Sequence, residues 1–204
     1  MKKMIIPCLF TLVAVAISLF FYGDLPERMV IHFGSNLKPD NWVSTGVGAF
    51  LLPALILFVG AITIISMRFE KNIQRRQRNE ASLNAIVTIL STTLFAVHCF
   101  TIAYNLGYKL SVAVFVTLIV GIVFVLMGNL MPRLRQSSRQ YPKLPEHVQN
   151  KALRFQGRSM LIIGFIFLLL SLLPNSYIFP AFFIGLSLFL VTIISSVIYY
   201  SRLR

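Results

Sequence analysis

The stretch Leu110–Met131 reads LSVAVFVTLIVGIVFVLMGNLM and contains no charged residue. A helix needs about 20 apolar residues to cross the roughly 30 Å hydrocarbon core of a bilayer. The stretch therefore has the length and the composition of one membrane span. Pro132 follows it directly, and Arg133 begins a basic segment.

Five other apolar runs have the same character, so we predict six membrane-spanning helices. These runs are Met4–Tyr22, Gly48–Met67, Leu83–Tyr104, Met160–Leu173 and Tyr177–Tyr200. One helix across the last two would need about 40 residues, which is too long for a bilayer, so we expect a turn at Pro174-Asn175-Ser176. The first run could be a signal peptide with a cleavage-like triplet at Ala14-Val15-Ala16, but its apolar residues continue through Phe21, which favours a retained helix.

The composition agrees with an all-α, polytopic membrane protein. Hydrophobic residues make up 57% of the chain and charged residues 12%, whereas soluble domains have about 45–50% apolar and about 25% charged residues. This excess of apolar residues excludes both a soluble globular domain and a disordered chain.

The positive charges predict the orientation of the spans. The chain has 19 Lys and Arg residues and a net charge of +13, and all but Arg28, Lys38 and Lys109 lie at the two termini or in the second and fourth connections. Because Lys and Arg are enriched in cytoplasmic loops, we predict that both termini are cytoplasmic. The charge is thus a topology signal, and we expect no direct nucleic-acid partner. A cluster of Arg75, Arg76 and Arg78 could in addition bind anionic lipid or an acidic protein surface.

Residues that support transport or catalysis are scarce. No Asp, Glu, Lys or Arg lies inside the six runs, although transporters and pumps usually keep ionisable groups there. His98 is either a hydrogen-bonding partner between helices or a proton relay. His32, His98 and His147 lie at three different depths, and the chain lacks the short motifs of zinc proteases, serine hydrolases and phosphate-binding loops. We predict no enzymatic activity, no metal site and no cofactor.

Small and polar residues in the runs indicate how the helices meet. Gly121 and Gly128 share one helix face two turns apart, a pattern that lets helices approach closely in lipid. Asn105 lies at the end of the third run, where an amide can cap the helix or bond across helices.

The first outer loop, residues 23–47, is too long for a mere turn. Pro26 and Pro39 stiffen it, and residues 29–33 suit a short extended segment. Trp42 is the only tryptophan, at a depth where indole rings favour the membrane interface. The loop is either an ordered re-entry with an interfacial anchor or a recognition surface on the cell exterior.

The inner connection, residues 132–158, predicts a short amphipathic helix. Pro145 suits the first helical position and Gly157 a C-terminal cap. Apolar residues recur between them at helical spacing, beside Lys151 and Arg154. We expect this helix to lie on the inner leaflet, either as a connector or as a docking platform for a cytoplasmic partner.

Several of these segments together resemble one family. The outer loop carries Leu25-Pro26, His32-Phe33 and Pro39-Asp40-x-Trp42, and the fourth run closes with Gly128-Asn129-Leu130-Met131-Pro132. These motifs are similar to those of the SdpI family, whose six-helix bacterial membrane proteins confer immunity to a secreted killing factor. The outer-loop motif looks like the signature of a domain of unknown function that opens many of these proteins. A weaker likeness lies at Gly157-Arg158.

The resemblance implies a multi-pass protein of the bacterial cell membrane that recognises a secreted peptide toxin outside and holds a transcriptional repressor inside. It places toxin recognition at Pro26, His32, Phe33, Pro39, Asp40 and Trp42, with Gly128, Asn129, Met131 and Pro132 as a family motif. Many relatives carry a Gly-[Ile/Leu]-Arg-Thr-Pro-Trp-Thr stretch after the fourth helix, which residues 139–146 replace here with RQYPKLPE. The inner role is therefore the less supported one. The alternative functions are a transporter or channel component and a structural or regulatory membrane subunit.

The expected organisation has three parts. Residues 1–67 form a two-helix unit with the outer loop, residues 68–81 a basic cytoplasmic loop, and residues 82–204 a four-helix region that resembles the SdpI family.

Overall fold

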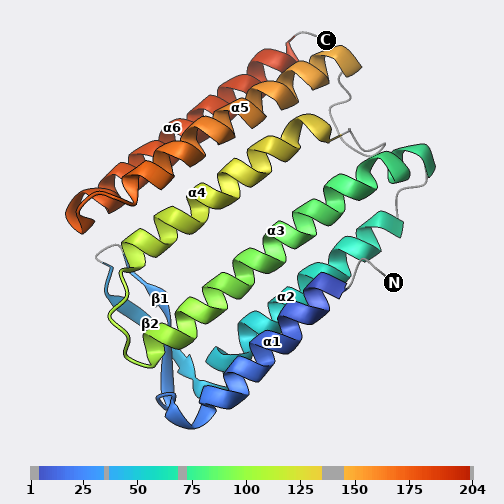
Figure 1. The fold of residues 1–204 in the computed structure, drawn as a ribbon. Coiled ribbons are helices and arrows are strands. Elements are labelled where there is room, and N and C mark those ends of the chain that lie inside the picture. Colours follow the sequence, from blue (N-terminus) through green and yellow to red (C-terminus); the bar gives the residue numbers. More distant parts are fainter. Residues whose placement is uncertain (1–4, 35–36, 69–72, 135–144, 203–204) are drawn as a thin grey trace. The chain divides into compact units, whose positions relative to one another are not determined.

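The computed structural model describes residues 5–34, 37–68, 73–134 and 145–202. Within these ranges it contains six long helices and one two-stranded sheet (Figure 1). The helices are α1 (Ile5–Phe21), α2 (Thr45–Arg68), α3 (Ile73–Asn105), α4 (Val112–Leu130), α5 (Glu146–Leu170) and α6 (Asn175–Ser201). The strands are β1 (Arg28–Phe33) and β2 (Pro39–Ser44), and short 3-10 turns follow α1 and α4.

The predicted all-α class with six spans is confirmed, because each helix is long and apolar enough to cross a membrane. The turn expected between the fifth and sixth helices is also present, since α5 ends at Leu170 and α6 begins at Asn175. The side of the membrane on which the termini lie stays a prediction.

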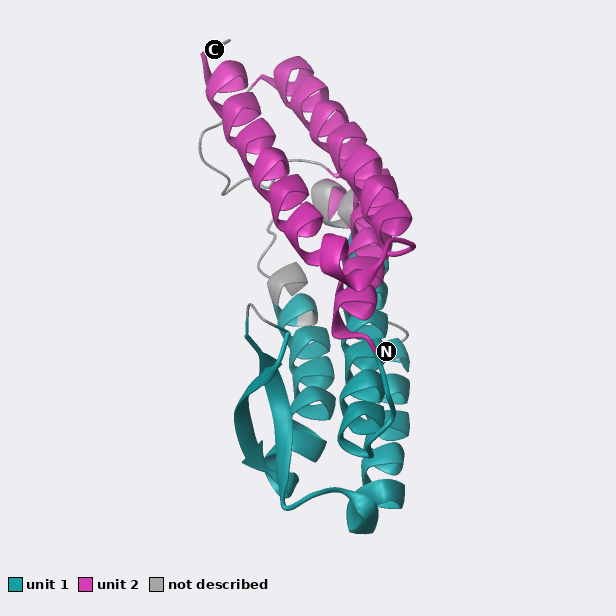
Figure 2. Ribbon diagram, turned by 90° about the vertical axis from the view of Figure 1, so that its left-hand side faces the viewer, with its two compact units in different colours: residues 1–69, 83–110 teal, residues 70–82, 111–204 magenta. Residues whose placement is uncertain are grey.

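The described chain forms two compact units (Figure 2). Unit 1 comprises residues 1–69 and 83–110, and unit 2 comprises residues 70–82 and 111–204. This grouping differs from the division expected at residue 82, because most of α3 belongs with α1 and α2. The physical reason lies in the polar contacts of His98 and Asn105, which join α3 to α1 and to the hairpin.

A proline in α2 explains one of the polar contacts within unit 1. Pro53 has no N–H, so it leaves the carbonyl of Ala49, four residues earlier, without its usual helical donor. The hydroxyl of Ser18 on α1 donates to that carbonyl at 2.6 Å. Ser18 thereby satisfies a buried backbone group that the proline has released.

His98 on α3 completes this polar link. Its Nε2 lies 3.1 Å from the carbonyl oxygen of Ala14 and 3.3 Å from the hydroxyl oxygen of Ser18. Because a carbonyl oxygen only accepts, Nε2 carries the proton in this arrangement. Of the two interpretations of His98, the structure confirms the hydrogen-bonding partner between helices.

In unit 2, α4 and α5 pack through paired glycines. A Cβ at Gly128 would lie 2.7 Å from the carbonyl oxygen of Gly157, and one at Gly121 would lie 3.0 Å from that of Gly164. The close approach expected of Gly121 and Gly128 is therefore present, with α5 as the partner (Figure 1).

The separate amphipathic helix expected before the fifth span is wrong. α5 runs without a break from Glu146, and Gly157 lies in its interior rather than at its C-terminus. Gly157 allows α5 to pack closely against α4, because a side chain at position 157 would collide with the backbone of α4. Pro145 precedes the first helical residue, so the predicted helix start is correct to within one position.

Candidate functional site

The outer loop folds into a β-hairpin that is fixed to the rest of unit 1 by a buried side chain. Met29 of β1 is fully buried and packs with Leu25, Ala49 and Ile102. Gly48 makes room for it, since a Cβ there would lie 2.8 Å from the Met29 sulfur. The extended segment expected at residues 29–33 is confirmed as β1, whereas β2 was not predicted from the sequence.

Asn105, at the end of α3, holds the hairpin from the side. Its Oδ1 accepts the backbone N–H of Val30 at 2.7 Å, and its Nδ2 donates to the carbonyl of the same residue at 3.1 Å. One amide side chain thus forms hydrogen bonds with both the backbone N–H and the backbone carbonyl of Val30, as a neighbouring strand would. We expected Asn105 to cap its helix or bond across helices, and the structure shows a strand as its partner. In the sequence, the only sign of this contact is that one amide residue stands at the end of the third apolar run.

The tip of the hairpin rests on the same end of α3. The ring of Phe33 meets that of Tyr104 edge to face, with 4.8 Å between the ring centroids. Phe33 is paired with Pro39 across the hairpin, and both are half-buried. These two candidate residues therefore help to seat the hairpin.

The other candidates in the loop are exposed. The side chains of His32 and Asp40 are 65% and 47% exposed, and Nδ1 of His32 lies 2.6 Å from Oδ1 of Asp40. Trp42 is 41% exposed. Pro26 is exposed as well, while its carbonyl accepts the hydroxyl of Thr45 at 2.6 Å. Five of the six candidate residues thus lie on the hairpin, and the sixth, Pro26, lies in the short segment directly before β1.

The stretch Gly128–Pro132, which carries part of the resemblance, lies at the end of α4 and in the 3-10 turn that follows it. Gly128 meets Gly157, and a Cβ on Gly157 would also lie 3.2 Å from Cβ of Met131 and 3.1 Å from Cδ of Pro132. Asn129 is exposed. The two stretches that carry the resemblance in unit 2, at Gly128 and at Gly157, are therefore in contact with each other.

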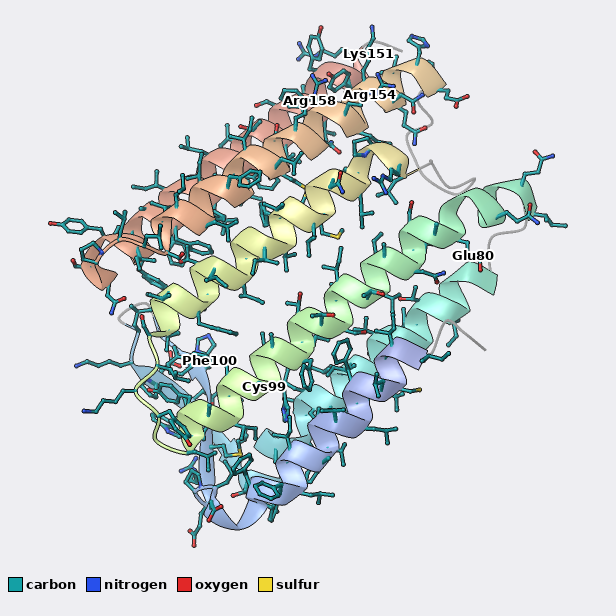
Figure 3. The ribbon with its side chains drawn as sticks, viewed as in Figure 1. Glu80, Cys99, Phe100, Lys151, Arg154 and Arg158 are labelled. Atoms are coloured by element: carbon teal, nitrogen blue, oxygen red, sulfur yellow. The ribbon has the colours of Figure 1, made fainter. Side chains whose placement is uncertain are left out.

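The basic residues at the predicted inner side are only partly described. Arg75, Arg76 and Arg78 lie on the backbone of α3, but their side chains fall outside the described part of the structure. On α5, Lys151, Arg154 and Arg158 are all exposed (Figure 3). Their spacing of three and four residues places them on one face of the helix.

Comparison with known proteins gives two matches. The family described as "Domain of unknown function (DUF1648)" matches residues 9–57, which contain most of α1, the hairpin and the first half of α2. Immunity protein SdpI of Bacillus subtilis (strain 168) is 26% identical over 210 residues, covering 100% of this chain and 99% of that protein. No solved structure matches the chain.

Proposed function

We propose that this protein recognises a secreted peptide toxin at its outer face. The chain is a homologue of the immunity protein SdpI along its full length, and is thus a multi-pass cell-membrane protein with a role in immunity. The proposed action is binding rather than catalysis. The hairpin is the proposed recognition surface.

The observation that carries this proposal is the way the hairpin is held. Met29 and Asn105 fix the backbone of β1, while Asp40 and Trp42 remain exposed on β2. A surface ordered before the ligand arrives loses little conformational entropy on binding. Exposed tryptophan is moreover one of the residue types that most often dominate binding energy at interfaces.

A growth assay tests the proposal. Cells with and without the chain are exposed to the secreted peptide fractions of related bacteria. We expect at least one fraction to kill only the cells that lack the chain. Equal killing of both strains by every fraction would contradict an immunity role.

Purified protein in liposomes separates immunity from the alternatives. Solute flux through the protein would support a transporter or channel component, and stable co-purification with another membrane protein would support a structural subunit. Immunity by recognition requires neither result.

A second candidate function is contact with an acidic cytoplasmic regulator. The exposed stripe of Lys151, Arg154 and Arg158 on α5 favours it, together with the cluster at Arg75, Arg76 and Arg78 near the start of α3. Glutamine at the three arginines of α3 should weaken binding by up to about 1 kcal/mol per charge at low salt.

Two probes distinguish the ligands that these two sets of basic residues could bind. Vesicles with anionic headgroups report lipid binding, and an acidic soluble peptide reports protein binding. If the glutamine variant binds both probes like the parent chain at low salt, the arginines act as topology signals alone.

A further inference from the structure

The register of the hairpin shows which backbone groups of β2 face away from β1. Thr45 donates its N–H to the carbonyl of Glu27, and Met29 lies opposite Val43. In an antiparallel ladder, hydrogen-bonded and non-hydrogen-bonded pairs alternate. The pairs Arg28–Ser44 and Val30–Trp42 are therefore the non-hydrogen-bonded ones, and their N–H groups point outward.

The two outer edges of the hairpin differ in whether their outward backbone groups have hydrogen-bond partners. On β1, Asn105 binds both outward groups of Val30. On β2, no residue in the described part of the chain binds the outward N–H and carbonyl of Trp42 or the N–H of Ser44. An open strand edge of this kind is a template for another extended chain.

The side chains along this edge indicate what would bind there. Trp42 and Ser44 lie two positions apart on the regular part of β2, so they share one face, and both are exposed. Asp40 is exposed as well and lies at the register shift near the tip of the hairpin. An added strand would place its own alternate side chains beside them. An aromatic or branched apolar residue of the added strand fits beside Trp42, and a Lys or Arg toward the tip of the hairpin fits the exposed carboxylate of Asp40.

We propose that the secreted toxin binds as an extended segment that adds a third strand to the hairpin along β2. This inference deepens the proposed function and rests on it. Strand addition is a common mode of peptide recognition, in which backbone hydrogen bonds give affinity and alternate side chains give specificity. A second copy of the chain suits the edge less well. The outward groups end where α2 begins at Thr45, and so short an edge falls well below the roughly 1,200 Å² that a stable interface buries.

The test removes one outward donor. Ser44→Pro deletes the N–H that would bind the added strand, at a strand end where proline is tolerated. Arg28→Pro is the matched control, because it deletes the outward N–H directly across the hairpin, on β1, the strand that Asn105 binds at Val30. The probe is a secreted peptide fraction that kills cells lacking the chain.

We expect Ser44→Pro to lower the protective effect about tenfold, the effect of one lost backbone hydrogen bond. Arg28→Pro should protect like the parent chain. Ser44→Ala keeps the N–H and measures the part played by the hydroxyl. Slow amide exchange at Val43 and Thr45 in each variant would show that the hairpin is still paired.

Amide exchange in the free protein tests the open edge without any toxin. The N–H groups of Trp42 and Ser44 should exchange much faster than those of Val43 and Thr45, and should become slow when the peptide fraction is added. Slow exchange in the free chain, with dimers that disappear in Ser44→Pro, would assign the edge to a second copy and overturn the proposal. Full protection by Ser44→Pro beside a protective parent chain would overturn strand addition alone, whereas a parent chain without protection would overturn the proposed function.

Discussion

Asn105 stabilises the hairpin with a single amide group. It makes two hydrogen bonds to Val30 and a third to the carbonyl of Thr101 on its own helix. The helix bond fixes the orientation of the amide, and the other two bonds position β1. The outer surface therefore depends on a residue that is not itself on that surface.

We predict that Asn105→Ala loosens the hairpin by about 1–3 kcal/mol, the usual cost of leaving backbone groups without their partners. The emission of Trp42, the only tryptophan, reports the change directly, together with faster amide exchange at Val30. Asn129→Ala is the matched control, because Asn129 is exposed on α4. Unchanged exchange at Val30 would show that Asn105 does not hold the strand.

Trp42 and Asp40 are the exposed residues that we expect to contact the toxin. Trp42→Ala should abolish protection while expression and membrane levels stay normal, because a large rigid anchor is lost. Asp40→Asn should weaken protection less, since the amide can still bond to His32 but carries no charge. The measurement is survival against the toxic peptide fraction, with membrane levels determined by immunoblot.

The control for this pair is Tyr177→Ala, because Tyr177 is a 66% exposed aromatic residue at the start of α6, away from the hairpin in the sequence. It should leave survival unchanged. Normal protection by a correctly inserted Trp42→Ala variant would leave Trp42 as an interfacial anchor and remove it from recognition.

Among the helices, α1 and α2 are joined through a backbone group that Pro53 releases. Ser18→Ala should lower the free energy of unfolding by about 1–3 kcal/mol, because the carbonyl of Ala49 loses its donor in an apolar environment. Pro53→Ala restores an N–H to α2 that can bond to this carbonyl. In the Pro53→Ala background, Ser18→Ala should therefore lower the free energy of unfolding by less. A double-mutant cycle of unfolding in detergent measures this difference. Equal costs in both backgrounds would mean that the two residues are not coupled.

The α4–α5 pair depends on the absence of side chains. Gly128→Ala should destabilise unit 2 by about 1–3 kcal/mol, because the methyl group would lie 2.7 Å from the carbonyl oxygen of Gly157 and the helices would have to separate. Gly23→Ala is the control, since a Cβ at this position, in the 3-10 turn after α1, would have nothing within 4 Å. Thermal unfolding in detergent compares the two. A Gly128→Ala variant as stable as Gly23→Ala would show that the helices tolerate the methyl group.

For the whole molecule, the distribution of positive charge predicts the orientation in the membrane. A reporter fused after Arg204 or inserted between Arg76 and Gln77 should report cytoplasm, and one near Ser35 should report the exterior. The reason is the concentration of Lys and Arg in the predicted inner segments. An exterior signal at Arg204 beside a cytoplasmic signal after Arg76 would contradict the six-span topology, because four spans separate these two positions. Exterior signals at both positions would invert the predicted orientation.

The length and apolar character of the runs were sufficient to predict the helices, because a bilayer imposes both on any segment that crosses it. The glycines of α4 were likewise readable, since small residues have few other uses in a lipid-facing helix. Gly157 was misread as a helix end. Its sequence neighbours allow either a cap or a packing site, and only the carbonyl of Gly128 opposite it distinguishes the two.

The candidate residues of the outer loop were predictable as a set, because they are close in the sequence and carry a motif. Their arrangement was not, since β2 has Pro39, Asp40 and Asn41 at its start and little of the pattern typical of a strand. It forms because β1 is already held by Met29 and Asn105, and pairing with β1 satisfies the backbone of β2.

The sequence by itself thus determined the class of protein, the number of spans and the loop that carries the exposed residues, because these follow from local composition in a bilayer. The tertiary structure alone decided which edge of the hairpin is closed and which is open. That choice depends on an amide at position 105 meeting a strand at position 30, and a contact between residues so far apart in the chain leaves no periodic pattern in the sequence.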